Sequence, residues 1–141
     1  MKVVILNSEN TENVLACFIA SGYEEFIVFG EVDEAYYSLN GIKITKLNYT
    51  LGEGTSQRLE KIKGSLCGRF FLAYMQTDKD VDSMLKFHRQ HGGLLTVIEE
   101  NKRLACAILE PEIFDYLDST LSLEKEIFLK VATDGEMKIY K

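Results

Sequence analysis

The sequence lacks several features that mark particular classes of protein. It has one proline, no tryptophan, and three cysteines that are far apart, with no CxxC pair and no histidine at zinc-finger spacing. These spacings argue against a disulfide framework and a structural zinc site. No apolar run approaches the ~18 residues that a membrane-spanning helix needs. Met1 leads directly into a short strand-like segment and not into the apolar core of a signal peptide. We therefore expect a cytoplasmic protein with no membrane partner.

Basic residues are also in the minority, which bears on the class of partner. The 141 residues include 16 basic and 22 acidic ones, a net charge of −6. Nucleic-acid binding needs a basic surface, so we expect no nucleic-acid partner. One stretch differs: residues 43–69 hold six basic and two acidic residues, a net charge of +4, which leaves −10 for the rest. This stretch predicts either a local site for a small anion or a solvated helix face with ordinary counter-ions.

What is present fits one globular domain. Hydrophobic residues make up 46% of the chain and charged residues 27%, a balance typical of a protein with a buried core. A length of 141 residues is usual for one domain. We therefore predict a single domain over residues 1–141.

Strand-like and helix-like segments alternate along the chain. Short apolar runs predict strands at residues 2–6, 25–29, 42–49, 69–74, 94–98, 105–109 and 137–140. Helical periodicity and capping residues predict helices at residues 11–21, 56–63, 80–91, 112–117 and 123–132, whereas residues 32–40 fit neither pattern. The alternation predicts a three-layer α/β fold, with a mostly parallel sheet and helices on both faces. In such sheets the ligand lies beyond the carboxyl ends of the strands, here residues 7–11, 30–33, 75–78 and 99–102.

Five segments match the pattern of one enzyme family, in the family's order and along nearly the whole chain. They are MKVVIL at residues 1–6, TSQRLEKI at 55–62, FHRQHG at 87–92, ILEPEIFDYL at 108–117 and SLEKE at 122–126. In these segments the chain resembles the sugar-phosphate nucleotidyltransferases, in particular the glucose-1-phosphate cytidylyltransferases. The resemblance implies a shortened nucleotide-diphospho-sugar transferase-like fold. The family's reaction is attack of a sugar 1-phosphate on the α-phosphorus of a nucleoside triphosphate, which releases pyrophosphate. That reaction needs phosphate-binding amides, a cation and magnesium-binding carboxylates.

The family's phosphate-binding residues are replaced in this sequence. Its glycine-rich loop aligns with NSENTE at residues 7–12, where Glu9 and Glu12 would repel a triphosphate. No Lys-Pro pair follows, so the family's activating lysine is missing. The aspartate that holds magnesium in the family aligns with Tyr74, and a tyrosine is not a ligand that magnesium prefers. A second magnesium aspartate would lie beyond Lys141.

The sugar and base contacts of the family are altered as well. Its Asn-Gly-Gly sugar contact aligns with residues 103–105, which are Arg-Leu-Ala, and its Thr-Gly-Gly-Arg base loop aligns with residues 55–58, which keep only the threonine and the arginine. Where residues match or replace the family's site, we predict two groups of binding residues. Nucleotide binding is predicted at Asn7, Ser8, Thr11, Thr55, Gln57 and Arg58, and sugar-phosphate binding at Glu100, Lys102 and Arg103.

The missing site residues predict a degenerate nucleotidyltransferase-like protein, a pseudoenzyme without catalytic residues. Its partner would be a nucleotide or a sugar phosphate, or it would act as a homodimer or a partner subunit of a complete enzyme in nucleotide-sugar and surface-polysaccharide metabolism. Two neighbouring tyrosines, Tyr36 and Tyr37, fit either a contact surface or core packing. The alternative predictions are an active sugar-1-phosphate cytidylyltransferase and a D-x-D metal-dependent glycosyltransferase-like protein.

Two further patterns each allow two interpretations. The D-x-D pair Asp78 and Asp80 resembles the metal-binding pair of nucleotide-sugar glycosyltransferases, which predicts Mg²⁺ or Mn²⁺; alternatively, one of these aspartates caps the following helix. His88 and His91 stand one helical turn apart and could share a metal ion. His88 also lies on the apolar stripe of its helix, which predicts a buried histidine with its hydrogen bonds satisfied.

Overall fold

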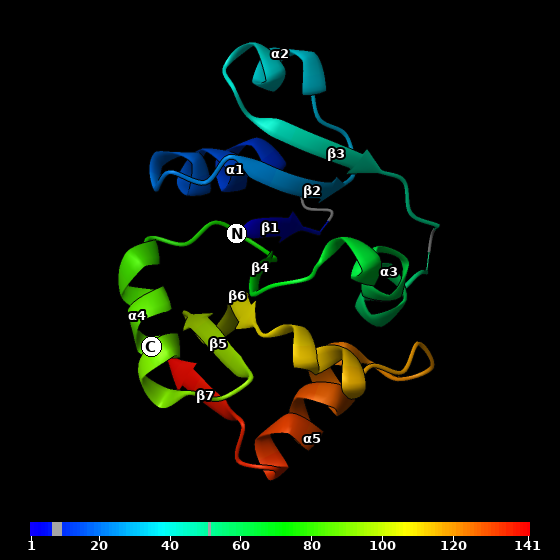
Figure 1. Ribbon diagram of the computed structural model, residues 1–141, viewed down its shortest axis with the longest axis vertical. Helices are drawn as coiled ribbons and strands as arrows, with labels where there is room; N and C mark the ends of the chain where they lie inside the picture. The colour runs from blue at the N-terminus through cyan, green and yellow to red at the C-terminus, as the bar shows by residue number, and fades with distance from the viewer. Residues whose placement is uncertain (7–9, 51) are drawn as a thin grey trace.

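A single mixed sheet organises the chain. The computed structural model describes residues 1–6, 10–50 and 52–141, and its seven strands have the order β3-β2-β1-β4-β6-β5-β7 (Figure 1). The strands are β1 (Lys2–Ile5), β2 (Glu25–Phe29), β3 (Lys43–Leu47), β4 (Phe70–Ala73), β5 (Leu95–Glu100), β6 (Arg103–Leu109) and β7 (Met137–Tyr140). Neighbouring strands are parallel except where β6 runs antiparallel to β4 and to β5. The predicted α/β fold with a mostly parallel sheet is confirmed.

Helices cover both faces of the sheet, because the strand side chains alternate between two apolar clusters. The α-helices are α1 (Thr11–Ala20), α2 (Glu34–Leu39), α3 (Thr55–Ile62), α4 (Val81–His91) and α5 (Phe128–Thr133). Helices α1 and α4 pack on one face through Phe18 and Met84, and α3 and α5 pack on the other through Leu59 and Val131 (Figure 1). Short helical turns connect them: η1 (Lys63–Ser65), η2 (Pro111–Asp115) and η3 (Leu123–Ile127).

The connection between β5 and β6 differs from the predicted alternation. These strands form an antiparallel hairpin with no helix between them. The hairpin turns at Asn101 and Lys102, with φ angles of 53° and 62°. Two successive residues at positive φ are typical of a type I′ turn. Asparagine tolerates a positive φ, but a lysine at the second position does not indicate a hairpin turn. Residues 99–102 were therefore expected to form a loop at the ligand-binding crevice.

The unassigned residues 32–40 contain the short helix α2. Its N-terminal residue Asp33 accepts a hydrogen bond from the Tyr36 amide at 3.2 Å, which explains why the helix begins there. The helix buries none of its own residues, and Leu39 is 87% exposed, so it has no apolar periodicity for sequence analysis to find. Two predicted helices also differ in detail: residues 111–115 form a 3₁₀ turn, and residues 123–127 form a π turn before α5.

Among the helices of the described residues, none is both long enough and apolar enough to cross a membrane.

Candidate functional site

The carboxyl ends of the parallel strands gather most of the predicted site residues. Thr11 begins α1 after β1, and it is 7% exposed. Thr55, Gln57 and Arg58 form the first turn of α3, which follows β3. Glu100, Lys102 and Arg103 lie in the β5–β6 hairpin, where Glu100 and Arg103 are paired residues. Asn7 and Ser8 lie outside the described residues.

The loop after β4 is held to both neighbours at this end of the sheet. The Asp78 amide donates a hydrogen bond to the Glu100 carboxylate at 3.2 Å. On the other side the Cys17 thiol lies 3.5 Å from the carbonyl oxygen of Thr77, whose side chain is buried. Burial raises the pKa of Cys17, and the carboxylates of Asp78 and Glu100 raise it further, so this thiol stays protonated. The loop therefore has a fixed position between α1 and the hairpin.

The first turn of α3 carries the most developed polar arrangement at this end. The Thr55 hydroxyl donates to the Glu124 carboxylate at 2.8 Å, which joins α3 to η3. The Gln57 side chain accepts from the Gly54 amide at 2.9 Å and so closes the start of the helix. The Arg58 guanidinium lies 4.4 Å from the centre of the Tyr49 ring and donates to the Glu53 carbonyl oxygen at 3.2 Å. Stacking and hydrogen bonding fix the guanidinium in one orientation.

Unpartnered polar atoms collect around this same turn. Four buried side-chain atoms there make no hydrogen bond in the structure: Ser56 Oγ, Arg58 Nε, Tyr74 Oη and Glu124 Oε2. Glu53 Oε1 also lacks hydrogen-bond geometry, but Lys61 Nζ lies 2.7 Å away, so we treat it as ion-paired. Buried polar atoms without partners are rare in folded proteins and mark places where a water or a ligand group is expected.

Tyr74 is the residue that follows the central strand β4 at this end. Burial raises the pKa of its phenol well above the ordinary value, and the Glu124 carboxylate raises it further. The nearby Thr55 hydroxyl lowers this pKa, although it donates its own hydrogen bond to Glu124 and has no hydrogen-bond geometry to the phenol. The phenol is therefore a neutral hydrogen-bond donor at any physiological pH. The sequence aligned Tyr74 with the family's metal ligand, but it did not predict Glu124 as a residue of the site. Glu124 lies 69 residues beyond Thr55, and only its place in the SLEKE segment gave any signal.

The D-x-D pair is not part of a larger cluster of metal-ligating side chains among the described residues. The Asp80 carboxylate accepts hydrogen bonds from the Ser83 amide at 3.1 Å and from the Ser83 hydroxyl at 2.7 Å, so it caps α4. Over residues 1–6, 10–50 and 52–141, no three His, Cys, Asp or Glu side chains come together to hold a metal ion. A Mg²⁺ or Mn²⁺ ion at Asp78 and Asp80 stays a prediction.

A second polar cluster lies at the opposite end of the sheet. His88 is 1% exposed, and its ring nitrogens lie 2.7 Å from the Thr96 hydroxyl and 2.5 Å from the Glu110 carboxylate. The same hydroxyl lies 2.6 Å from Nε2 of His91, and Arg69 donates to the Glu110 carboxylate. The prediction of a buried, hydrogen-bonded His88 is confirmed. This cluster lies at the amino ends of the parallel strands, whereas the candidate site lies at their carboxyl ends.

Comparisons with known proteins identify the fold. No family model matches the sequence, and no curated protein matches it. Among solved structures, the inositol-1-phosphate CTP transferase from T. maritima is similar, with a TM-score of 0.61 and 10% sequence identity over 99% of this chain and 84% of that chain. The chain therefore has a nucleotidyltransferase-like fold, as the resemblance implied. The narrower likeness to glucose-1-phosphate cytidylyltransferases and the shortening of the fold stay predictions.

Proposed function

We propose that the protein binds a nucleotide or a sugar phosphate at the carboxyl end of its sheet and does not transfer a nucleotidyl group. The observation that carries this proposal is the group of buried, unpartnered polar atoms around the first turn of α3. Ser56, Arg58 and Tyr74 offer donors there, and Glu124 offers an acceptor. A mixed set of this kind suits a base edge or a sugar hydroxyl, both of which donate and accept hydrogen bonds.

The same end of the sheet supports binding without catalysis. Tyr74 follows the central strand as a neutral phenol, and a neutral phenol cannot replace a carboxylate as a ligand of a hard cation. Asp80, one of the two predicted metal ligands, is occupied as the cap of α4. With Asp80 in that role, a tyrosine at the family's metal position and no lysine at the family's activating position, the charge that develops on a transferring phosphoryl group would stay uncompensated.

A structural likeness to a CTP transferase adds a specific first ligand to test. The neighbour's name includes CTP, so CTP and CDP-glucose are the nucleotide probes, and glucose 1-phosphate is the sugar-phosphate probe. Binding is measured by isothermal titration calorimetry with and without Mg²⁺. We expect saturable binding of one probe, and Thr55→Val and Arg58→Gln should each weaken it about fivefold to tenfold. Thr55→Val removes the hydroxyl that positions the Glu124 carboxylate, and Arg58→Gln removes a donor to the ligand.

A matched variant controls for the loss of a hydroxyl group alone. Thr133 is exposed at the end of α5 and donates only to its own helix, to the Leu129 carbonyl oxygen. Thr133→Val should therefore leave the affinity unchanged. Equal affinities for the parent, Thr55→Val and Arg58→Gln proteins would contradict binding at α3, provided that each variant keeps a cooperative thermal transition.

The role as a partner subunit belongs to the same proposal. A protein that binds a nucleotide sugar without turnover serves nucleotide-sugar or surface-polysaccharide metabolism through a second copy or through a complete enzyme. Tyr36 and Leu39 on α2 are 59% and 87% exposed and offer apolar surface for such a contact. Analytical ultracentrifugation measures the oligomeric state, and a monomer at every concentration would contradict the homodimer.

A further inference from the structure

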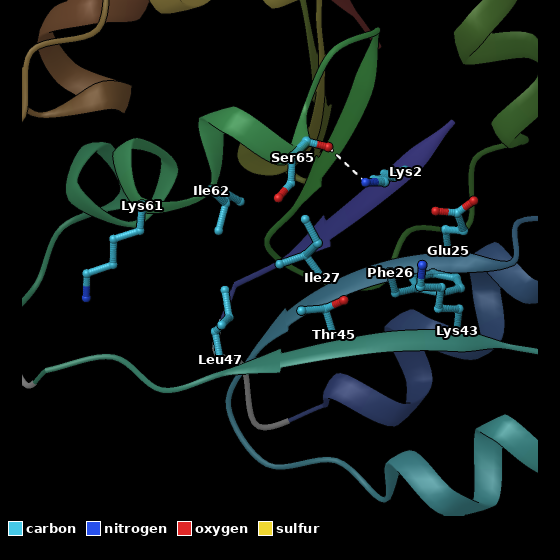
Figure 2. A pocket seen from close by; sticks show the side chains of 10 residues that line it. All are labelled: Lys2, Glu25, Phe26, Ile27, Lys43, Thr45, Leu47, Lys61, Ile62 and Ser65. Carbon is cyan, nitrogen blue, oxygen red and sulfur yellow. Dashed lines mark hydrogen bonds between the residues drawn. The ribbon is translucent and has the colours of Figure 1, made fainter.

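A pocket lies between the sheet and the end of α3. It is a cavity of ≈ 200 Å³ that β1, β2 and β3 line together with Lys61 and Ile62 of α3 (Figure 2). We name it the lysine pocket and define it by Lys2, Glu25, Ile27, Lys43, Leu47 and Ile62. Lys2, Glu25 and Lys43 are the first residues of β1, β2 and β3, so the pocket opens at the amino ends of these strands.

Positive charge dominates the open end of the pocket. Glu25 and Lys43 are opposite each other in the β2–β3 register, and Lys2 precedes the residue paired with Phe26, so the three form a row across the sheet. The Lys2 ammonium donates to the Ser65 carbonyl oxygen at 2.8 Å (Figure 2). In the described part of the chain, no ion pair joins Lys2 or Lys43 to a carboxylate. One carboxylate therefore faces two ammonium groups.

The floor of the pocket is apolar. Ile27 and Ile62 are each 4% exposed, and Leu47 packs against the same core cluster. Figure 2 shows Ile27, Leu47 and Ile62 around the inner part of the pocket, with Lys2 and Lys43 beside the outer part. A ligand that fits both parts has an anionic group and a short apolar group. The volume is below the ~300–1,000 Å³ of pockets for drug-sized ligands, which favours a small molecule over a whole nucleotide.

The charge distribution of the whole chain makes this pocket an exception. Residues 43–69 carry a net charge of +4, and the remainder of the chain carries −10. Of the basic residues in this stretch, Lys43 and Lys61 line the pocket, and Lys61 is ion-paired with Glu53. Lys2 and Lys43 are therefore the ammonium groups that attract an anion there. A phosphomonoester carries about −1.5 to −2 charges at neutral pH, which matches two ammonium groups better than a single carboxylate does.

From this combination of charge, floor and size, we propose that the lysine pocket binds a small organic phosphate. The charged residues of this site stand at the amino ends of β1, β2 and β3, whereas the proposed nucleotide site lies at the carboxyl end of the sheet. Lys43, the first lysine of the basic stretch, then belongs to a local anion site.

The test uses phenyl phosphate as the probe and two-dimensional ¹H–¹⁵N NMR of the full chain as the readout. We expect saturable movement of the amide signals of Ile27, Lys43 and Thr45. Inorganic phosphate should bind more weakly because it cannot use the apolar floor, and benzoate should bind more weakly because it carries a single charge. Equal affinity for either comparison compound would overturn the proposal.

Variants connect the binding to the pocket. Lys43→Gln should weaken phenyl phosphate binding about fivefold, the usual effect of losing one exposed charge contact. Thr45→Glu places a carboxylate on the exposed pocket side of β3 and should weaken binding more than tenfold. Lys86→Gln changes an exposed lysine on α4 that is outside the pocket and is the control. Absence of saturable binding, or equal affinity in all four proteins, would overturn the proposal.

The positions of the amide signals that shift distinguish this proposal from the proposed function. Movement confined to Ser56, Arg58 and Tyr74 would place the phosphate at the first turn of α3, which supports the proposed function and overturns the lysine pocket. Movement at the lysine pocket in a protein that binds neither CTP nor glucose 1-phosphate would support this inference alone.

Discussion

The Thr96 hydroxyl lies 2.7 Å from Nδ1 of His88 in the buried layer between α4 and β5. Which group donates and which accepts in each hydrogen bond of this histidine cluster follows from the Gly93 amide, which can only donate. The Gly93 amide donates to Nδ1 of His91 at 3.0 Å, so the proton of that ring sits on Nε2 and is donated to Thr96. Thr96 then donates to His88, and Nε2 of His88 donates to Glu110. Every donor has an acceptor when both histidines are neutral.

The first prediction is that stability decreases below neutral pH. Burial lowers the pKa of His88 most, although hydrogen bonding to Glu110 opposes it and Arg69 and Arg89 add to the lowering. Burial, His88 and Lys138 lower the pKa of His91, although Glu136 opposes this. Because both pKa values are below the ordinary ~6.5, the unfolded chain takes up protons first as the pH falls. The free energy of unfolding should decrease below pH ~6.5, by at most about 1.4 kcal/mol per pH unit for His88.

Urea denaturation between pH 7.5 and pH 5.5 measures this effect. His91→Gln cannot take up a proton, so its stability should depend less on pH than that of the parent. The neutral-histidine assignment would be wrong if the parent's free energy of unfolding were constant over this range.

The second prediction concerns the shared hydroxyl. Thr96→Val keeps the shape of the buried side chain but leaves Nδ1 of His88 and Nε2 of His91 without their partner. Buried polar atoms without partners cost about 1–3 kcal/mol each, so the free energy of unfolding should fall by at least about 1 kcal/mol. Thr45→Val, at an exposed position on β3, is the matched control and should change stability by less than about 0.5 kcal/mol. Similar denaturation midpoints for the two variants would refute the shared hydrogen bond.

The third prediction separates the two roles offered for Asp80. Asp80→Ala removes the cap of α4 and should lower the free energy of unfolding by about 1 kcal/mol, a fall of about 4 °C in Tm. Asparagine caps a helix as well as aspartate does, so Asp80→Asn should keep the parent's Tm. Thermal scans with and without Mn²⁺ complete the test. A Mn²⁺-dependent rise in Tm that the parent shows and Asp80→Asn loses would establish the metal role instead.

The fourth prediction concerns the β5–β6 turn. Lys102 holds a φ of 62°, where glycine is unstrained and a side chain is not. Lys102→Gly should therefore raise the free energy of unfolding by about 0.5–1 kcal/mol. The same substitution at Lys86, inside α4, should lower it by about 1 kcal/mol, because glycine destabilises helix interiors. Chemical denaturation gives both values, and destabilisation at both positions would contradict the turn assignment.

Sequence patterns predicted the fold where apolar residues carry the information. The continuous apolar run of β4, with its four residues all buried, and the apolar stripe on α1 each identify one element without ambiguity. The β5–β6 hairpin was not predicted because its turn is Asn101-Lys102 and not Asn-Gly, the sequence that indicates this turn most strongly. Helix α2 was not predicted because a helix that buries none of its residues has no periodic pattern of apolar residues.

The candidate site was predictable only in part. Residues 55–58 could be identified because they stay together in sequence, and the structure joins them to Tyr74 and Glu124 from two other elements. The Thr55–Glu124 hydrogen bond spans 69 residues, and no local pattern specifies such a pair. Of the row Lys2, Glu25 and Lys43, only Lys43 lies in the basic stretch that the sequence showed, because strand register and not sequence spacing brings the three together.

The measurement that tests the central claim most directly combines binding and turnover in one sample. The protein is mixed with CTP, glucose 1-phosphate and Mg²⁺; bound CTP and bound glucose 1-phosphate are determined by equilibrium dialysis, and released pyrophosphate by a coupled enzymatic assay. The account predicts saturable occupancy by CTP or by the sugar phosphate, with pyrophosphate no higher than in a sample without protein. Pyrophosphate release that rises in proportion to protein concentration, or no occupancy by either molecule, would contradict it.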